Sequence, residues 1–510
     1  MNDKRVSPLY IVAISAVIAV IAFFLWWFGP QLAHGTWVAL RFNPVFTIGF
    51  ITAVVTGLIS WYRYDQGDHD FLDIFGVIAI LSLVTGVVFM LFVSPFFVLR
   101  SYASANEVVQ IESQDDTRIG YNQRAPFDVA QYASTKFMGD SDGDATNIVK
   151  ALPAYADKNG IYTTSIKRRG FLQGYESTQM MDVPLLGSMS NEDVRKCNFS
   201  PEAKMRLDGS WPTINLVRKI YTKTPISVKV VRDDAFAYCH NDDPYVVAPL
   251  STIKGGFFPH RAPYGVAIYN GTTGEVSIHK DLKESGLMPG LPLYPKSVAA
   301  LQRESIKTED GYMSYLFSRG GYETTDGDEN SPNAGNNKEF SLASIVDDYE
   351  SHFVTPLTAR GSSQNIVALG DVVSSNFTSG ELNTYNVMKY PDGQAREAAS
   401  TIADRIISEK FDGYKAGQMS VFEVAPASEG RWVATIGRDQ SIRYRAYIFP
   451  DGRIDLVDAQ GKKENNPAED EGGEVSSIDT GIDFTNMSSD DIAKLVNDAL
   501  RELTVRAEEK

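Results

Sequence analysis

Long uncharged apolar stretches in the first hundred residues constrain this chain more than any other feature. Residues 9–28 include twenty positions without a charge, which is about the length that a helix needs to cross the core of a bilayer. Two further stretches lie at 45–61 and 74–99, and Trp61 and Tyr62 stand where aromatic anchors are expected at a membrane interface. The sequence predicts three N-terminal transmembrane helices, forming an anchor over residues 1–100. A cleaved signal peptide is the alternative for the first stretch, but that stretch is long and lacks a small-residue cleavage pattern.

Basic residues near these stretches predict the orientation of the chain. Lys4, Arg5 and Arg63 lie on one side of the predicted bilayer, and Arg41 and Arg100 lie on the other. Because positive charge is enriched in cytoplasmic loops, we expect a cytoplasmic N-terminus. Three crossings would then place everything after Arg100 outside the cytoplasm, so the predicted location is the cell membrane with an extracytoplasmic C-terminal region.

The two cysteines of the chain, Cys197 and Cys239, both lie after the apolar stretches. A bond between them would close a loop of about forty residues and would persist in an oxidising compartment. We expect this disulfide, although two unrelated buried thiols remain an alternative. A zinc site is disfavoured because no CxxC, HxxxH or HExxH spacing accompanies them.

The formal net charge of −16 argues against a nucleic-acid partner, because phosphate binding needs a basic face. The dense basic cluster at Lys167, Arg168 and Arg169 is expected on the solvated face of a hairpin. The expected partners are the lipid bilayer and an envelope protein or a second copy of the chain.

The region after residue 100 contains three short apolar runs that resemble one another, YVVAPL at 245–250, FVTPL at 353–357 and FEVAP at 422–426. Each precedes further strand-like runs, and prolines fit at strand ends or sheet edges. Residues 395–411 place Ala395, Ala399, Ile402 and Ile406 on one helical face. The predicted fold is therefore an α+β extracytoplasmic region of repeated helix-plus-antiparallel-sheet modules, with chance similarity of short runs as the alternative.

These patterns divide the chain into an anchor, several modules and two linkers. The predicted parts are an anchor at 1–100, a first α+β segment at 101–195, an α+β module containing both cysteines at 196–323, a flexible loop at 324–339, a strand-rich module at 340–393, a third α+β module at 394–458, an acidic disordered linker at 459–487 and a C-terminal amphipathic helix at 488–510.

Motifs for catalysis and metal binding are weak. SxxK occurs at Ser251–Lys254 and at Ser277–Lys280, but both fall in strand or turn contexts rather than at the start of a helix. Asp140, Asp142 and Asp144 resemble the opening of an EF-hand loop, but its required glycine and glutamate are replaced by alanines. No glycine-rich phosphate loop lies between a strand and a helix. We therefore predict no catalytic residues, no metal and no cofactor, and a looser calcium site stays open.

The segment GVAIYNGTTGEVSIHK, residues 265–280, reads as strand, turn and strand. With the preceding helix and strand, it resembles the PepSY-type module, a small extracytoplasmic domain of bacterial membrane proteins and protease propeptides. The resemblance implies binding or inhibition rather than catalysis. The TGE turn is absent after FVTPL and FEVAP, although Gly380 and Glu381 partly restore it.

The first functional hypothesis is a membrane-anchored protein that displays non-catalytic modules for protein interaction or assembly at the cell envelope. A phage or a mobile element is a candidate source of its gene. One alternative is an envelope hydrolase whose site no motif reveals. Another is a subunit of a transport or secretion complex, but the predicted spans hold no charged residue that would form an ion path.

Overall fold

The computed structural model describes residues 8–458 with internal gaps. The gaps are at 66–68, 93, 114–119, 139–142, 146–149, 154–160, 256–258, 283–285, 288, 318, 326–338, 346–349, 362–364, 392–394, 412–415, 429 and 440. Nearly all of the predicted loop at 324–339 falls in one gap. The predicted linker at 459–487 and the predicted helix at 488–510 lie outside the described residues.

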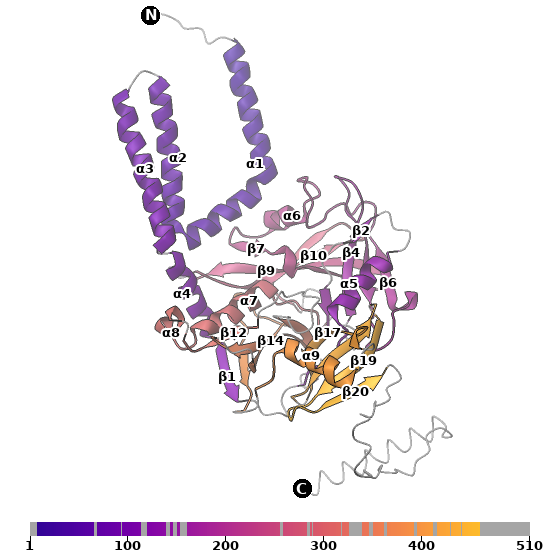
Figure 1. Cartoon of the computed structure of the whole chain (residues 1–510). Coiled ribbons are helices and arrows are strands. Elements are labelled where there is room, and N and C mark those ends of the chain that lie inside the picture. Colours follow the sequence, from indigo (N-terminus) through magenta and orange to yellow (C-terminus); the bar gives the residue numbers. More distant parts are fainter. Residues whose placement is uncertain are drawn as a thin grey trace, which may run out of the picture. The chain divides into compact units, whose positions relative to one another are not determined.

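The chain begins with helices (Figure 1). They are α1 (Pro8–Phe42), α2 (Pro44–Asp65), α3 (His69–Phe92) and α4 (Ser94–Asn106). Helices α2 and α3 pack side by side, and glycine allows their backbones to approach closely. A Cβ atom added to Gly49 would lie 2.6 Å from the backbone oxygen of Ser82, and one added to Gly86 would lie 3.3 Å from the Cα atom of Phe46.

The prediction of three N-terminal transmembrane helices is wrong. Among the described residues, one helical segment, Pro44–Tyr62 in α2, is long and apolar enough to cross a membrane. The apolar part of α3, Ile74–Phe89, is shorter than a complete span. The third predicted stretch, 74–99, is divided between α3 and α4, and α4 packs against helix α7 (Lys296–Ser305) instead of continuing α3. After α4, most of the regular structure of the described chain is β-strand, arranged in several β-sheets.

Helix α1 differs from the predicted first span because its second half contacts the β-sheet region. The Trp27 ring lies 4.5 Å from the Trp211 ring, and the backbone oxygen of Trp26 accepts a 2.9 Å hydrogen bond from Arg218. Farther along, the His34 ring stacks on Tyr221. Pro30 lies inside α1, which bends along its length in Figure 1, as a helix does where proline removes a hydrogen bond. Apolar composition alone did not reveal that α1 extends beyond residue 28.

The described strands form four sheets, numbered here in chain order. Sheet 1 follows α5 (Phe127–Lys136) and contains β2 (Asp144–Ala145), β3 (Lys150–Leu152), β4 (Ile161–Lys167), β5 (Tyr175–Met181) and β6 (Val194–Asn198). Sheet 2 follows α6 (Leu216–Lys223) and contains β7 (Val228–Val230), β8 (Phe236–His240), β9 (Asp243–Lys254), β10 (His260–Asn270) and β11 (Val276–His279).

The other two sheets lie later in the chain, except for one early strand. Sheet 3 follows α7 and α8 (Tyr312–Leu316) and contains β1 (Val109–Ser113), β12 (Tyr322–Thr324), β13 (Phe340–Ala343), β14 (Ser351–Ala359), β15 (Ile366–Val373) and β16 (Tyr385–Lys389). Sheet 4 follows α9 (Ala399–Lys410) and contains β17 (Ser420–Pro426), β18 (Trp432–Arg438), β19 (Ser441–Ile448) and β20 (Ile454–Asp458). The predicted helix at 395–411 is confirmed from Ala399 onward as α9, which buries Ile402 and Ile406, while Ala395 lies before the helix.

Sheets 1, 2 and 3 share one connectivity in the part of the chain that the structure describes. In each, two short consecutive strands pair with the same side of a long strand, and two antiparallel strands follow on its other side. In sheet 2, β8 pairs with β9 up to Val247, and β7 pairs with β9 from Leu250 onward. In sheet 3, β13 pairs with β14 up to Val354, and β12 takes over at Leu357.

The prolines of YVVAPL and FVTPL lie where one short partner strand gives way to the next. Pro249 and Pro356 both fall in that interval, where no strand on that side needs their missing N–H group. FEVAP differs, because it lies in the edge strand β17 and its Pro426 ends that strand. In sheet 4 the strand next to the edge is β18, so RWVATIG is the counterpart of YVVAPL.

The sheets cover one another through shared hydrophobic cores. One core joins sheets 1, 2 and 3 through residues such as Met180, Val266 and Leu357. A second joins sheets 3 and 4 and includes α9, and a third joins sheets 4 and 1 and includes α5. Each sheet therefore depends on its neighbours to exclude water from its apolar face.

The close approach of α2 and α3 yields a test with a matched control. Gly49→Leu should force the two helices apart, at a cost of about 1–3 kcal/mol, and raise hydrogen exchange in both. Gly57→Leu places the same side chain on α2 where no atom lies within 4 Å of the added Cβ. Hydrogen-exchange mass spectrometry in detergent measures both variants, and equal protection in the two would contradict this packing.

Candidate functional site

A cavity of about 400 Å³ lies between sheets 1 and 2. Sheet 1 lines it with Thr163, Thr164 and Ser165 of β4, and sheet 2 lines it with Phe236 of β8 and Val246 of β9. The Thr163 hydroxyl lies 2.5 Å from the backbone oxygen of Ala237 and connects the two sheets. Along β4, the partner strand changes from β3 to β2 between Thr163 and Ile166, so Thr164 and Ser165 have no partner strand on that side. Pro249 has the equivalent position on β9 in sheet 2.

Charged side chains also line this cavity, and Lys167 and Asp208 among them form an ion pair. The Lys167 ammonium lies 2.6 Å from the Asp208 carboxylate, and Arg206 lies 3.3 Å from the same carboxylate. Burial opposes ionisation of Asp208, but the hydrogen bond from Lys167 and the charges of Lys167 and Arg206 outweigh it and lower the pKa of Asp208. The Lys150 ammonium, also at the cavity, donates to the backbone oxygen of Asp233.

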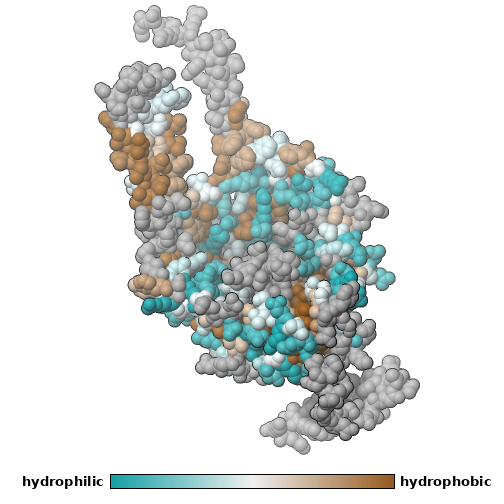
Figure 2. All heavy atoms as spheres, in the orientation of Figure 1, coloured by the Kyte–Doolittle hydropathy of each residue, from teal (hydrophilic) through white to brown (hydrophobic). Residues whose placement is uncertain are grey.

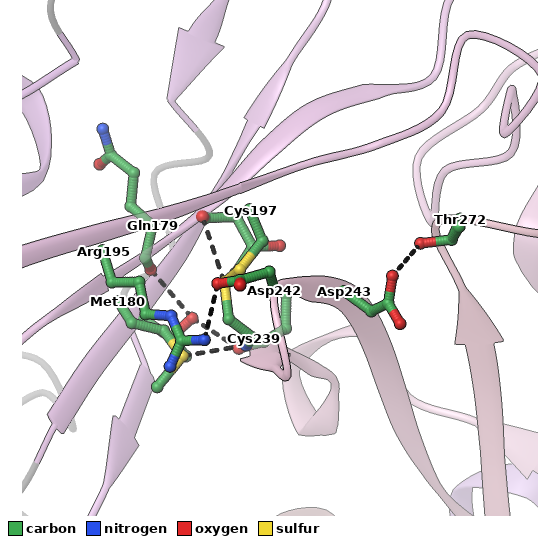
Figure 3. The surroundings of a disulfide bond; sticks show 11 residues. Gln179, Met180, Arg195, Cys197, Cys239, Asp242, Asp243 and Thr272 are labelled. Atoms are coloured by element: carbon green, nitrogen blue, oxygen red, sulfur yellow. Dashed lines mark hydrogen bonds and ion pairs between the residues drawn. A yellow bond between two sulfur atoms is a disulfide. The ribbon is translucent and has the colours of Figure 1, made fainter.

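The predicted disulfide between Cys197 and Cys239 is confirmed, and it joins the two sheets that enclose the cavity (Figure 3). Cys197 lies in β6 and Cys239 in β8, with 5.9 Å between their Cα atoms. Both are almost completely buried. The backbone N–H of Cys239 donates to the Met180 sulfur at 2.9 Å, so the covalent link lies within the packed interface of sheets 1 and 2.

A buried ion pair connects sheet 4 to the segment before α5. Arg124 lies 2.7 Å from the Glu423 carboxylate of β17, and their side chains are only 9% and 4% exposed. Burial opposes the positive charge of Arg124, but the Glu423 carboxylate overcomes this effect and raises the pKa of the guanidinium. Arg445 of β19 reinforces this seam by donating to the backbone oxygens of Leu185 and Arg124 at 3.0 and 2.9 Å.

A second buried ion pair and a buried histidine lie in sheet 3. Arg303 of α7 lies 3.1 Å from Glu339, just before β13. His352 of β14 and Asp371 of β15 are diagonal neighbours on paired strands, and the His352 Nδ1 atom lies 2.9 Å from the Asp371 carboxylate. A histidine paired with an aspartate is found in catalytic triads, but both residues lie within the core of sheet 3 and neither lines the cavity between sheets 1 and 2.

The residues singled out from the sequence are dispersed. Lys167 pairs with Asp208, Arg168 donates to the backbone oxygen of Phe199 at 3.0 Å, and Arg169 lies 3.4 Å from Asp144. Lys167 of this cluster therefore lines the cavity, whereas Arg169 is exposed, as predicted for a solvated hairpin face. Asp140 and Asp142 lie outside the described residues. Within the described ranges, no group of three or more histidine, cysteine, aspartate or glutamate residues could hold a metal ion.

Both SxxK segments lie in strand contexts. Ser251 and Lys254 belong to β9, and Ser277 belongs to β11, as the sequence analysis predicted. Asp208, Phe236 and Thr164 gave no signal in the sequence. They come together through the packing of sheet 1 against sheet 2 and through a turn that holds Asp208, so no local motif could have identified them.

Comparisons with known proteins leave the family of this chain open. No family model matches it, and no curated protein matches it. Among solved structures, a GH43 β-1,3-galactosidase with galactodeoxynojirimycin aligns over 59% of this chain and 89% of its own, at 11% identity and a TM-score of 0.14. A TM-score this low does not indicate a shared fold, and nothing is transferred from that enzyme.

The disulfide should contribute measurably to stability. Replacing Cys197 and Cys239 together with serine should lower the free energy of unfolding by about 4 kcal/mol, because the bond constrains a long loop in the unfolded chain. Urea unfolding followed by tryptophan fluorescence measures this loss. Reductant should destabilise the natural protein and leave the serine variant unchanged, whereas an effect on both would contradict the assignment.

Asp128 of α5 yields a pH test. Burial, together with the charge of Glu423, raises the pKa of Asp128 from its usual 3.8 to about 6. The folded state therefore binds this proton more tightly than the unfolded state, so Asp128 adds stability as pH falls through 6 and costs stability above it. After allowance for solvent screening, Asp128→Asn should stabilise the protein by about 1 kcal/mol at pH 7.5.

The advantage of Asp128→Asn should disappear near pH 4, where the natural carboxyl is protonated in the folded state. Chemical unfolding at both pH values measures it. Asp404→Asn, on the exposed side of α9, controls for the general loss of a carboxylate. An equal gain from Asp128→Asn at pH 4 and pH 7.5 would contradict the assignment.

Proposed function

We propose that this chain is a membrane-anchored protein whose β-sheet region serves protein interaction or assembly at the cell envelope without catalysis. The observation that carries the proposal is the exposed apolar surface of α2. Leu58 is 59% exposed and Trp61 is 70% exposed, and Figure 2 shows apolar residues along the visible faces of α2 and α3. Such a surface is unfavourable in water and favourable in a bilayer. Helix α2 is the proposed crossing helix.

Aromatic contacts support a position of sheet 1 near the bilayer surface. The centre of the Trp211 ring lies 4.5 Å from that of Trp27 in α1 and 6.0 Å from that of Phe171. Phe171 and Leu172, at the tip of the β4–β5 hairpin, are more than half exposed. Aromatic and apolar side chains beside basic residues are typical of the membrane interface, and Arg168 and Arg169 precede this tip.

The disulfide supports an extracytoplasmic location of the β-sheet region, and the ion pairs support its non-catalytic role. A disulfide persists in an oxidising compartment, which favours an extracytoplasmic position for sheets 1 and 2. The Lys167–Asp208 and Arg124–Glu423 pairs are suited to hold sheets in register rather than to transfer protons. We also infer that the shared connectivity of sheets 1, 2 and 3 reflects a structural repeat, which would present similar surfaces to a partner protein.

Alkaline carbonate extraction tests the membrane anchor. The natural protein should remain in the membrane pellet, whereas Val55→Lys/Leu58→Lys should be extracted, because two charges in the bilayer cost about 5 kcal/mol. The control is Met313→Lys/Phe317→Lys, which alters two exposed apolar residues at helix α8, outside the proposed crossing helix. This variant should stay in the pellet.

Release of the natural protein by carbonate would refute the anchor. Spheroplasts prepared from the same cells test on which side of the membrane the β-sheet region lies. Protease added to spheroplasts should digest the β-sheet region, and protection of that region with free thiols at Cys197 and Cys239 would refute the extracytoplasmic location.

A further inference from the structure

The cavity between sheets 1 and 2 has two walls of different chemistry. Sheet 1 supplies hydroxyl and charged side chains, because Thr163, Ser165 and Lys167 alternate along β4 and all three line the cavity. Sheet 2 supplies an apolar wall that includes Phe236 and Val246. The volume of about 400 Å³ is within the range of sites that hold a small organic molecule.

Strand pairing places two charged residues at opposite ends of this cavity. Lys150 of β3 is paired in register with Thr163, and Asp144 of β2 is paired with Lys167. All four residues line the cavity, so the two charges share one face of sheet 1. Because each residue of a strand advances the chain by about 3.3 Å, the two ends are about 13 Å apart along β4.

One end of the cavity is positive. Lys150 lines it with Arg232, and the Lys150 ammonium donates to the backbone oxygen of Asp233, the residue after Arg232. The Arg232 guanidinium has neither an ion pair nor a hydrogen bond with any described residue. The carboxylate of Asp234 attracts Lys150, but Asp233 and Asp234 line an adjoining cavity, where Asp234 accepts two hydrogen bonds from Ser297. Arg232 is therefore the cation that is available to a ligand.

The opposite end is acidic, since Asp144 and Asp208 line it against the single ammonium of Lys167. Asp208 is held by Lys167 at 2.6 Å and by Arg206 at 3.3 Å. Asp144 lies 3.4 Å from Arg169, and the two side chains of this pair are 66% and 71% exposed. Water screens so exposed a pair, so a ligand ammonium can take the place of Arg169 beside Asp144.

A buried hydroxyl lies between the two ends. Tyr175 lines the cavity and is 4% exposed, and its hydroxyl accepts a 3.1 Å hydrogen bond from the backbone N–H of Leu207. No acceptor for the proton of this hydroxyl is present in the described ranges of the chain. A buried donor without an acceptor costs free energy, which a ligand carbonyl oxygen in the cavity would recover.

We propose that this cavity binds a short peptide with free termini, two or three residues long, in an extended conformation. Its carboxylate would lie between Lys150 and Arg232, its ammonium beside Asp144, and a carbonyl oxygen near Tyr175. An extended tripeptide is about 10 Å long, and the charged side chains at both ends cover the remaining distance. The apolar wall of sheet 2 would contact the side chains of the peptide.

This inference goes beyond the proposed role in protein interaction and does not rest on the membrane anchor. The cavity is formed by sheets 1 and 2 and by the segments that connect their strands. A peptide in it would contact both sheets across the interface that the disulfide already joins.

Isothermal titration calorimetry of the detergent-solubilised full chain at low salt tests this site. Alanyl-leucyl-alanine should bind in equimolar amount. Amidation of its carboxyl terminus and acetylation of its amino terminus should each weaken binding about tenfold, because each removes a charge-assisted hydrogen bond. Equal binding of the three peptides would overturn the proposal, and so would a lack of binding by the unmodified peptide.

Two variants assign each end of the peptide to its partner. Arg232→Gln should weaken binding of the unmodified peptide about threefold, as expected for an exposed cation, and should leave the amidated peptide unaffected. Asp144→Asn should have a similar effect on the unmodified peptide and leave the acetylated peptide unaffected. The controls Arg443→Gln and Asp404→Asn, at exposed positions of sheet 4 and α9, should change the binding of no peptide.

The modified peptides also separate recognition from a general effect on the fold. If Arg232→Gln weakens the unmodified and amidated peptides equally, the assignment of the carboxylate to this end is wrong. If Asp144→Asn weakens the unmodified and acetylated peptides equally, the assignment of the ammonium is wrong. Either result would overturn the proposed orientation, because a disturbed sheet weakens every peptide alike.

Discussion

The sheets of this protein are held by the requirement that each apolar face be covered by a neighbouring sheet. Sheets 1, 2 and 3 contribute to one core, sheets 3 and 4 to another, and sheets 4 and 1 to a third. Helices α5 and α9 fill positions at these contacts. Because burial of apolar surface is the main favourable contribution to folding, no sheet would retain its structure in isolation from the others. The cavity between sheets 1 and 2 depends on this arrangement.

Charged groups determine how the sheets align, while apolar contacts supply most of the stability. Arg124 and Glu423 join the segment before α5 to sheet 4, and Lys167 and Asp208 lie near the contact of sheets 1 and 2. A buried ion pair contributes little net stability, since desolvation offsets the attraction, but breaking it leaves an uncompensated charge. An alternative alignment of the sheets would separate these partners, so the pairs disfavour it.

Local features were predicted from the sequence, and long-range pairing was not. The α9 helix and the β10–β11 turn at Asn270 follow from local spacing and turn chemistry. The short strands β7 and β8 carry little periodicity, and their joint pairing with β9 depends on contacts far along the chain. The length of an apolar stretch could not show that α1 continues onto sheet 2, and Asp208 had no motif that would place it at a cavity.

The position of the disulfide constrains the order in which the chain can be assembled during synthesis. Cys239 lies in β8, before β9, β10 and β11 in the chain, so the covalent link can close before these three strands have been synthesised. Sheet 1, complete by β6, would then hold the first part of sheet 2. The later strands of sheet 2 would be added to an edge that is already tethered, which shortens their conformational search.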